Sequence, residues 1–262
     1  MISAELFIAC LAAIEKTVLI ERADVNDKEF HFQNWVQARL IDTGFNFDAP
    51  GRNSFPDFLM VDTPNGFEVK GLAYPGRGKT YDGNGQVAKG MHNGRSIYYV
   101  FGRYPKKPDG NTYPVIDLII CHGSFLNADS NYVHQNKSAR GFGSYGDIMI
   151  RDRKMYVIPT PFALAEGLAH NYTLILPSEA QLDDRFVNVG ELIRKETDTL
   201  LTSYSFDLVT NEMTVTKVPN PSAGKEHCFT AWRLKHQGGD TVRMRNISDI
   251  VSDIENAVED NE

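Results

Sequence analysis

The sequence predicts an α/β fold, in which a mixed central β-sheet is flanked by helices and the C-terminal half adds β-hairpins. Three features support this prediction. Two N-terminal segments carry apolar residues at helical spacing. The segments that follow are short runs rich in β-branched and aromatic residues, which favour strands. The second half of the chain contains further short runs of this kind, separated by polar loops.

The helices are expected from apolar periodicity and from capping residues. Residues 3–22 predict a first helix because apolar side chains recur near helical spacing. A second helix is expected over residues 27–43, where Asp27 can cap the start and Gly44 follows the end. A short helix is expected around residues 86–92, within a glycine-rich stretch. Two later helices are expected over residues 189–201 and 247–258.

The strands are expected where the apolar period changes. Residues 58–62 and 67–72 are strand-like and are joined by Thr63-Pro64-Asn65-Gly66, a turn sequence with proline at its second position. Two stronger strands are expected at residues 96–104 and 115–121. The second half is expected to add a hairpin over residues 147–159 and short strands at residues 172–176, 214–217 and 230–234.

The composition is that of an ordinary soluble globular protein. Of 262 residues, 42% are hydrophobic and 23% are charged, which excludes a disordered chain. The net charge of −7 is unevenly placed, since residues 246–262 hold six acids and no base. The acidity of the whole chain therefore does not exclude nucleic acid as a partner, because local charge sets the field at a site.

Cysteine usage and hydropathy predict a cytoplasmic protein. Cys10, Cys121 and Cys228 stand far apart, which fits reduced thiols better than disulfides or a zinc site. The apolar stretch of residues 6–14 has no basic flank before it, so we expect a buried helix face there and not a signal peptide. No apolar run reaches the roughly 18 residues that a membrane span requires, so no membrane partner is expected.

The most informative residues for chemistry lie on the two strands joined by the turn. Asp57 stands at the start of the first strand, and Glu68 and Lys70 lie on the second. Glu68 and Lys70 are separated by one residue, so both side chains point to the same face of the strand. Two carboxylates can hold a hard divalent cation through oxygen ligands, and a nearby ammonium can stabilise the charge on a reacting phosphate.

Whether Asp57 shares that face depends on the register of the hairpin. A two-residue loop would place Asp57 opposite Leu72, on the face that carries Glu68. Pro64, however, cannot take the positive φ of a primed two-residue turn. A type I turn with a bulge at Gly66 would move Asp57 to the other face. The sequence leaves both registers open.

The spacing of these residues resembles a known motif. Pro56-Asp57, ten intervening residues and then Glu68-Val69-Lys70 resemble the signature of the PD-(D/E)XK nuclease superfamily, which includes most type II restriction endonucleases. The expected order of elements over residues 28–121 is similar to that superfamily's core, which has a helix, three strands, a second helix and another strand. The resemblance therefore implies a restriction-endonuclease-like core.

The same resemblance implies a Mg²⁺ cofactor. Asp57, Glu68 and the main-chain carbonyl of Val69 would bind the metal, and Asp57, Glu68 and Lys70 would form the catalytic set. Some members of the superfamily add an acid from the preceding helix, and Glu29 is the candidate for it here. We favour a different role for Glu29, which falls in the first helical turn and can stabilise the helix dipole there.

Basic and amide side chains are placed where a nuclease would meet DNA. Residues 76–107 hold seven bases and one acid, among which Arg77, Lys79 and Lys89 are expected to contact phosphates. Side chains that suit base edges follow in the expected hairpin tip and in the loop before it. These candidates are Asn136, Lys137, Arg140, Arg151, Arg153 and Lys154.

We therefore expect a type II site-specific deoxyribonuclease that hydrolyses double-stranded DNA and leaves 5′-phosphates. Residues 1–122 would form the catalytic core and residues 123–262 the recognition and accessory part, packed together as one domain. ATP is not expected, because the chain has no phosphate-binding loop motif. A homodimer is left open. Two alternatives are a structure-selective repair or recombination nuclease and a non-catalytic module that binds nucleic acid.

Overall fold

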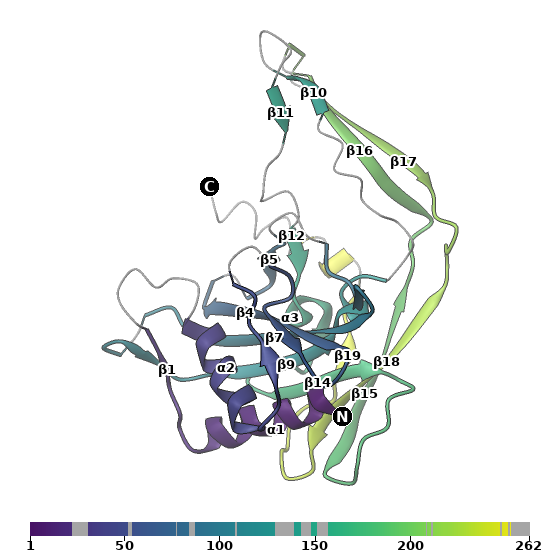
Figure 1. Cartoon of the computed structure of the whole chain (residues 1–262). Helices are drawn as coiled ribbons and strands as arrows, with labels where there is room; N and C mark the ends of the chain where they lie inside the picture. The colour runs from purple at the N-terminus through teal and green to yellow at the C-terminus, as the bar shows by residue number, and fades with distance from the viewer. Residues whose placement is uncertain are drawn as a thin grey trace.

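The computed structural model describes residues 1–22, 31–51, 54–76, 78–83, 87–107, 109–128, 139–142, 148–150, 157–207, 209–210, 212–246, 248–250 and 252. These residues form a mixed α/β fold, in which one large mixed sheet is flanked by few helices (Figure 1). The fold class predicted from the sequence is confirmed at this level.

Nine strands form the large sheet within the described part of the chain. They are β2 (Phe47–Asp48), β3 (Phe58–Met60), β4 (Asn65–Tyr74), β6 (Met91–His92), β7 (Arg95–Pro105), β9 (Asp117–His122), β14 (Tyr172–Pro177), β15 (Phe186–Lys195) and β18 (Glu226–Leu234). Their spatial order is β15-β18-β14-β9-β7-β4-β3-β2, with β6 paired to β7. The pairs β4–β7 and β9–β14 are parallel, and the other neighbours are antiparallel.

The middle of the sheet is buried on both faces. Val100 and Phe101 in β7 and Ile119 and Ile120 in β9 are neighbours along their strands, and all four are 0% exposed. Continuous apolar runs of this kind are typical of strands that are covered on both sides. The strong strands expected at residues 96–104 and 115–121 are thus confirmed as the centre of the fold.

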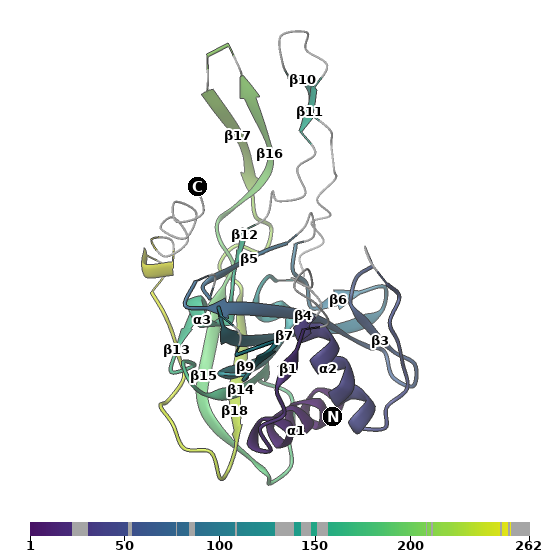
Figure 2. The same ribbon diagram turned by 90° about the vertical axis from the view of Figure 1, so that its left-hand side faces the viewer.

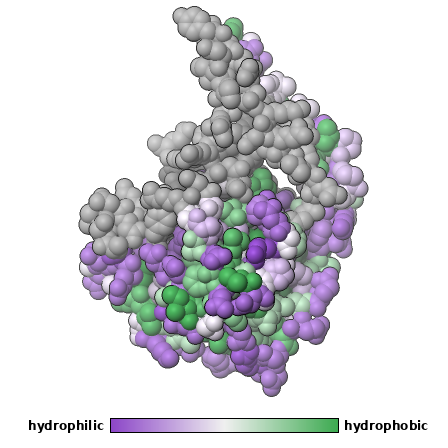
Figure 3. All heavy atoms as spheres, viewed as in Figure 1, coloured by the Kyte–Doolittle hydropathy of each residue, from purple (hydrophilic) through white to green (hydrophobic). Residues whose placement is uncertain are grey.

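Two helices, α1 (Ile2–Glu15) and α2 (His31–Asp42), pack on one face of the sheet (Figures 1 and 2). Leu6 and Phe32 are buried there in one apolar cluster with Phe67 and Val69 of β4. Gly44 has a φ of 71°, which is the left-handed conformation expected just after a helix end. The outer surface of the body mixes hydrophilic side chains with smaller hydrophobic patches (Figure 3).

The first helix is shorter than the sequence predicts. The helix ends at Glu15, and Thr17 turns the chain with a φ of 56°. Residues 20–21 then form strand β1 (Ile20–Glu21), which pairs with β8 (Thr112–Tyr113). The expected helix over residues 3–22 is wrong beyond this point, because the backbone pairs with a distant segment. Asp27, the expected cap of the second helix, lies outside the described residues.

The other face of the sheet is covered mainly by short elements. These are β5 (Thr80–Asp82) paired with β12 (Val157–Pro159), the 3₁₀ turn η1 (Gly123–Phe125), α3 (Pro161–Leu164), and β13 (Ala165–Glu166) paired with β19 (Arg243–Met244). They enclose a second apolar cluster, which contains Leu72 of β4, Tyr81 of β5, and Tyr99 and Phe101 of β7. This second face also carries Glu68 and Lys70, because they alternate with Phe67 and Val69 along β4.

Three predicted elements are wrong. In place of the helix at residues 189–201, β15 and the start of a further strand pair with partners far along the chain. In place of the helix around residues 86–92, the described part contains strand β6. The hairpin over residues 147–159 does not form, because β11 (Ile148–Ile150) pairs with β10 (Ala139–Phe142) and β12 pairs with β5. Its charged tip, residues 151–154, lies outside the described residues.

A two-stranded hairpin projects from the body. Strands β16 (Thr199–Asp207) and β17 (Glu212–Pro219) pair with each other and continue the β15–β18 pair outward (Figures 1 and 2). The expected strand at residues 214–217 is confirmed as part of β17. Of the tail helix expected over residues 247–258, residues 248–250 and 252 are described, and these are helical.

Candidate functional site

The hairpin β3–β4 places Asp57 directly across from Glu68. Phe58 pairs with Phe67 and Leu59 with Gly66, and Asp57, which directly precedes β3, continues this register toward Glu68. Asp57 therefore shares a face with Glu68. The shared face agrees with one of the two registers left open by the sequence, although Asp57 lies beside Glu68 and not Leu72.

The loop of this hairpin is longer than either turn considered from the sequence. Residues 61–64 lie between the strands without belonging to them. Arg95 holds this loop from the neighbouring strand, since its Nη1 donates hydrogen bonds to the carbonyl oxygens of Met60 at 2.7 Å and Thr63 at 3.2 Å. The register is thus fixed partly by an arginine from a different strand.

Hydrogen bonds join the three motif residues. The backbone N–H of Asp57 donates to Oε2 of Glu68 at 3.2 Å. The backbone N–H of Val69 donates to Oδ2 of Asp57 at 2.8 Å. Nζ of Lys70 donates to Oε1 of Glu68 at 2.7 Å. The structure thus brings together all four residues that the sequence assigned to catalysis or metal binding.

Burial and a neighbouring negative charge raise the pKa of Asp57. Glu68 is only 9% exposed, and Asp57 is half-buried beside it. Burial, and then repulsion from Glu68, raise the pKa of Asp57 to about 7, although the Val69 N–H and Lys70 act in the opposite direction. Two partly buried carboxylates therefore face each other with one ammonium beside them.

This arrangement suits a hard divalent cation. The donors are carboxylate and carbonyl oxygens, which Mg²⁺ prefers, and Mg²⁺ commonly uses only one or two protein carboxylates and keeps several waters. A cation between Asp57 and Glu68 would offset the repulsion that raises the pKa of Asp57. Within the described residues, no group of three or more His, Cys, Asp and Glu side chains is arranged to hold a metal. Any metal site here would therefore rest on this pair and the Val69 carbonyl.

An aromatic side chain completes the surroundings of Lys70. Its Nζ lies 5.7 Å from the centroid of the Tyr81 ring, within the range of a cation–π contact. Tyr81 belongs to β5, which runs over this part of the sheet. The residue is buried, with an exposed fraction of 7%. Sequence reasoning missed Tyr81, because β5 is short and its pairing partner β12 lies far along the chain.

Of the lysines expected to contact phosphate, Lys89 lies near the motif. Lys89 places its Nζ 5.6 Å from the ring centroid of Phe55, two residues before Asp57, and the His92 ring packs edge-on against the same Phe55. Burial, and then the charge of Lys89, lower the pKa of His92. Lys79 is exposed and directly precedes β5.

Most of the other predicted contacts lie outside the described residues. These are Glu29, Arg77, Asn136, Lys137, Arg151, Arg153 and Lys154. Arg140 falls in β10, and its side chain is likewise outside what the structure describes.

Two bases of the segment 76–107 have structural partners instead of exposed positions. Arg95 binds the hairpin loop, as described above. Arg103 is buried, and its guanidinium pairs through Nε and Nη2 with Asp117, which is 0% exposed. The guanidinium also lies over the rings of Tyr74 and Phe162, at 4.4 and 4.1 Å from their centroids. A count of basic residues therefore overstates the charge available for phosphates.

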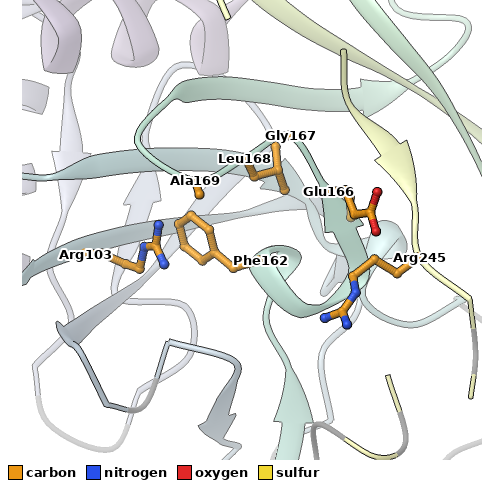
Figure 4. A pocket seen from close by; sticks show the side chains of 8 residues that line it. Arg103, Phe162, Glu166, Gly167, Leu168, Ala169 and Arg245 are labelled. Atoms are coloured by element: carbon orange, nitrogen blue, oxygen red, sulfur yellow. The ribbon is translucent and has the colours of Figure 1, made fainter. Parts of the chain in front are cut away.

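A cavity of about 320 Å³ opens beside Arg103 (Figure 4). Phe162 and the segment 165–169 line it together with Arg245. Its charged groups already have partners, since Arg103 pairs with Asp117 and Glu166 pairs with Arg243 at 2.6 Å. The cavity is therefore a weaker candidate for a functional site than the Asp57–Glu68–Lys70 cluster.

Comparison with known proteins gave no match among family models, curated proteins or solved structures. In the described part of the chain, no helix has the length and apolar character needed to cross a membrane. The assignment of function therefore depends on the residues of the site themselves.

Proposed function

We propose that the protein is a Mg²⁺-dependent, site-specific endonuclease that resembles type II restriction enzymes and cuts double-stranded DNA. The observation that carries this proposal is the placement of Asp57 beside Glu68, with Lys70 hydrogen-bonded to Glu68 on the same sheet face. In this proposal, the large sheet and helix α2, which packs on the face opposite Glu68 and Lys70, form a restriction-endonuclease-like core.

Each residue of the cluster has a chemical role in this proposal. Asp57, Glu68 and the Val69 carbonyl are the oxygen ligands for Mg²⁺, which when bound lowers the pKa of a coordinated water and offsets charge on the phosphate. Lys70, held by Glu68 at 2.7 Å, places its ammonium where negative charge develops on the phosphate oxygens. Hydrolysis that releases the 3′ oxygen would leave 5′-phosphate ends.

The proposal also assigns residues that contact DNA. Lys79 and Lys89 lie close in sequence to β5 and β6, and they supply positive charge for the phosphate backbone. Base reading is assigned to residues 136–140 and 151–154. The enzyme is proposed to be cytoplasmic, to need no ATP, and to act alone or as a homodimer.

The direct test is digestion of long, unmethylated DNA with Mg²⁺, followed by sequencing of the ends. We expect discrete fragments with 5′-phosphates, and we expect Lys70→Ala protein, purified in the same way, to produce none. That variant also excludes a contaminating nuclease. A smear, or cutting confined to branched DNA, would favour a structure-selective nuclease. DNA binding without cutting, across several DNAs and metals, would refute the nuclease proposal and leave a binding module.

A further inference from the structure

Tyr81 occupies a fixed position beside the candidate catalytic lysine. Its strand β5 pairs with β12, where Tyr81 is opposite Ile158. Thr160 fastens the start of the same segment, because its N–H donates to the Lys79 carbonyl at 2.8 Å and its Oγ1 donates to the Gly78 carbonyl at 2.7 Å. The backbone that carries Tyr81 is therefore held by a segment from a distant part of the chain.

The ring of Tyr81 is packed from several sides. It meets Phe101 edge-on at a centroid distance of 5.4 Å and Tyr99 at 6.4 Å. Both partners lie on β7, next to the strand that carries Lys70. These contacts restrict the orientation of the ring, and with it the face that the ring presents to Lys70.

Lys70 is thus held by two contacts of different kinds. Its Nζ donates to Glu68 at 2.7 Å and lies 5.7 Å from the Tyr81 ring centroid. The Lys70 side chain is 21% exposed, so it is partly shielded from water. A lysine has a flexible four-carbon stem, and a second contact restricts the directions that the ammonium can take.

We propose that Tyr81 is a positioning residue, whose aromatic ring keeps the Lys70 ammonium at the candidate site. This inference rests on the proposed nuclease function for its catalytic consequence, although the positioning itself can be measured without catalysis. The ring, and not the hydroxyl, carries the role, because the Tyr81 hydroxyl is buried and has no hydrogen-bond partner in the described structure.

Three variants separate these contributions. Tyr81→Phe keeps the ring and removes the unpaired hydroxyl, so it should behave as wild type at Lys70 and unfold at a higher temperature. Tyr81→Leu removes the ring. Phe125→Leu is the matched control, since Phe125 is 0% exposed in the same apolar cluster and packs against Phe229. If Tyr81→Leu does not fold, Tyr81→Met offers a more adaptable side chain without a ring.

The first readout is the rate at which an amine-reactive reagent labels Lys70 in metal-free protein without DNA, measured by mass spectrometry relative to exposed Lys16. We expect Tyr81→Leu to raise this ratio by about 2- to 30-fold, the range that a cation–π contact allows. Tyr81→Phe and Phe125→Leu should leave the ratio unchanged. An unchanged ratio in Tyr81→Leu, or an equal rise in Phe125→Leu, would overturn the inference.

The second readout is DNA cleavage. Tyr81→Leu should lower kcat by a similar factor and leave KM within about twofold, since Lys70 acts on the transition state more than on bound DNA. Tyr81→Phe should restore kcat. If the wild-type protein cuts no DNA while the labelling ratios behave as expected, the nuclease proposal fails and the positioning role stands. Cleavage by wild type with wild-type kcat in Tyr81→Leu would refute the positioning role alone.

Discussion

Replacement of Asp57 by asparagine should remove a pH dependence from the stability of the metal-free protein. Burial and the facing Glu68 raise the pKa of Asp57 from an ordinary value of 3.8 to about 7. Between these pH values, the folded protein keeps a proton that the unfolded chain has released. The folded state is therefore favoured at the acidic end of this window and loses that advantage as the pH rises through it.

The size of this effect is bounded by one proton. The free energy of unfolding should fall with a slope that approaches at most about 1.4 kcal/mol per pH unit in the middle of the window. Asparagine can still accept the Val69 hydrogen bond that Asp57 accepts at 2.8 Å, but it does not titrate. The Asp57→Asn protein should consequently have a flatter profile between pH 4 and 7.

Urea unfolding in EDTA, at half-unit steps of pH, measures the two profiles. Asp62→Asn is the matched control, because Asp62 is exposed in the same hairpin and accepts a hydrogen bond from Asn46 outside the cluster. Addition of Mg²⁺ should reverse the wild-type trend, since a cation binds the ionised pair and stabilises the fold more as the pH rises. Parallel profiles for wild type and Asp57→Asn in EDTA would refute the reasoning.

Three further predictions concern catalysis, stability and DNA binding. Lys70→Ala should lower the cleavage rate by about 100-fold or more while a DNA-binding titration stays within about twofold of wild type, because the ammonium serves the transition state. Asp117→Asn should lower the free energy of unfolding by about 3–5 kcal/mol, since it leaves the charge of the buried Arg103 without a counter-charge. Glu166→Gln, at an exposed ion pair, should change it by less than about 1 kcal/mol in the same urea titration. Lys89→Gln should reduce the slope of log affinity against log salt by about one, as expected for one lost phosphate contact, and an unchanged slope would remove Lys89 from the DNA surface.

The sequence was enough to predict which side chains of the candidate site share a face of strand β4, but not which residue lies beside Asp57. The two-residue period of a strand was enough to place Glu68 and Lys70 on one face, and the structure agrees. The partner of Asp57 could not be predicted, because it depends on the length of the hairpin loop. Arg95, more than thirty residues away, holds that loop through backbone carbonyls, and such a contact leaves no local signal.

The errors in the fold have a similar origin in pairing between distant segments. Residues 186–195 form a strand because β18 supplies backbone partners along their whole length. Residues 157–159 pair with residues 80–82 and not with the local partner that their apolar run predicts. Local propensity is a weak guide where tertiary pairing decides between helix and strand.

The central sheet also limits how the chain can be divided. Strand β9 ends at His122, and it pairs with β7 on one side and with β14, from the second half of the chain, on the other. A fragment that stops at residue 122 would leave one edge of β9 open over residues 118–121, all of which are 0% exposed in the whole protein. An open, apolar edge strand is a template for uncontrolled strand addition between molecules. Expression of residues 1–122 alone should therefore give insoluble aggregates, even though every residue of the proposed catalytic cluster is present.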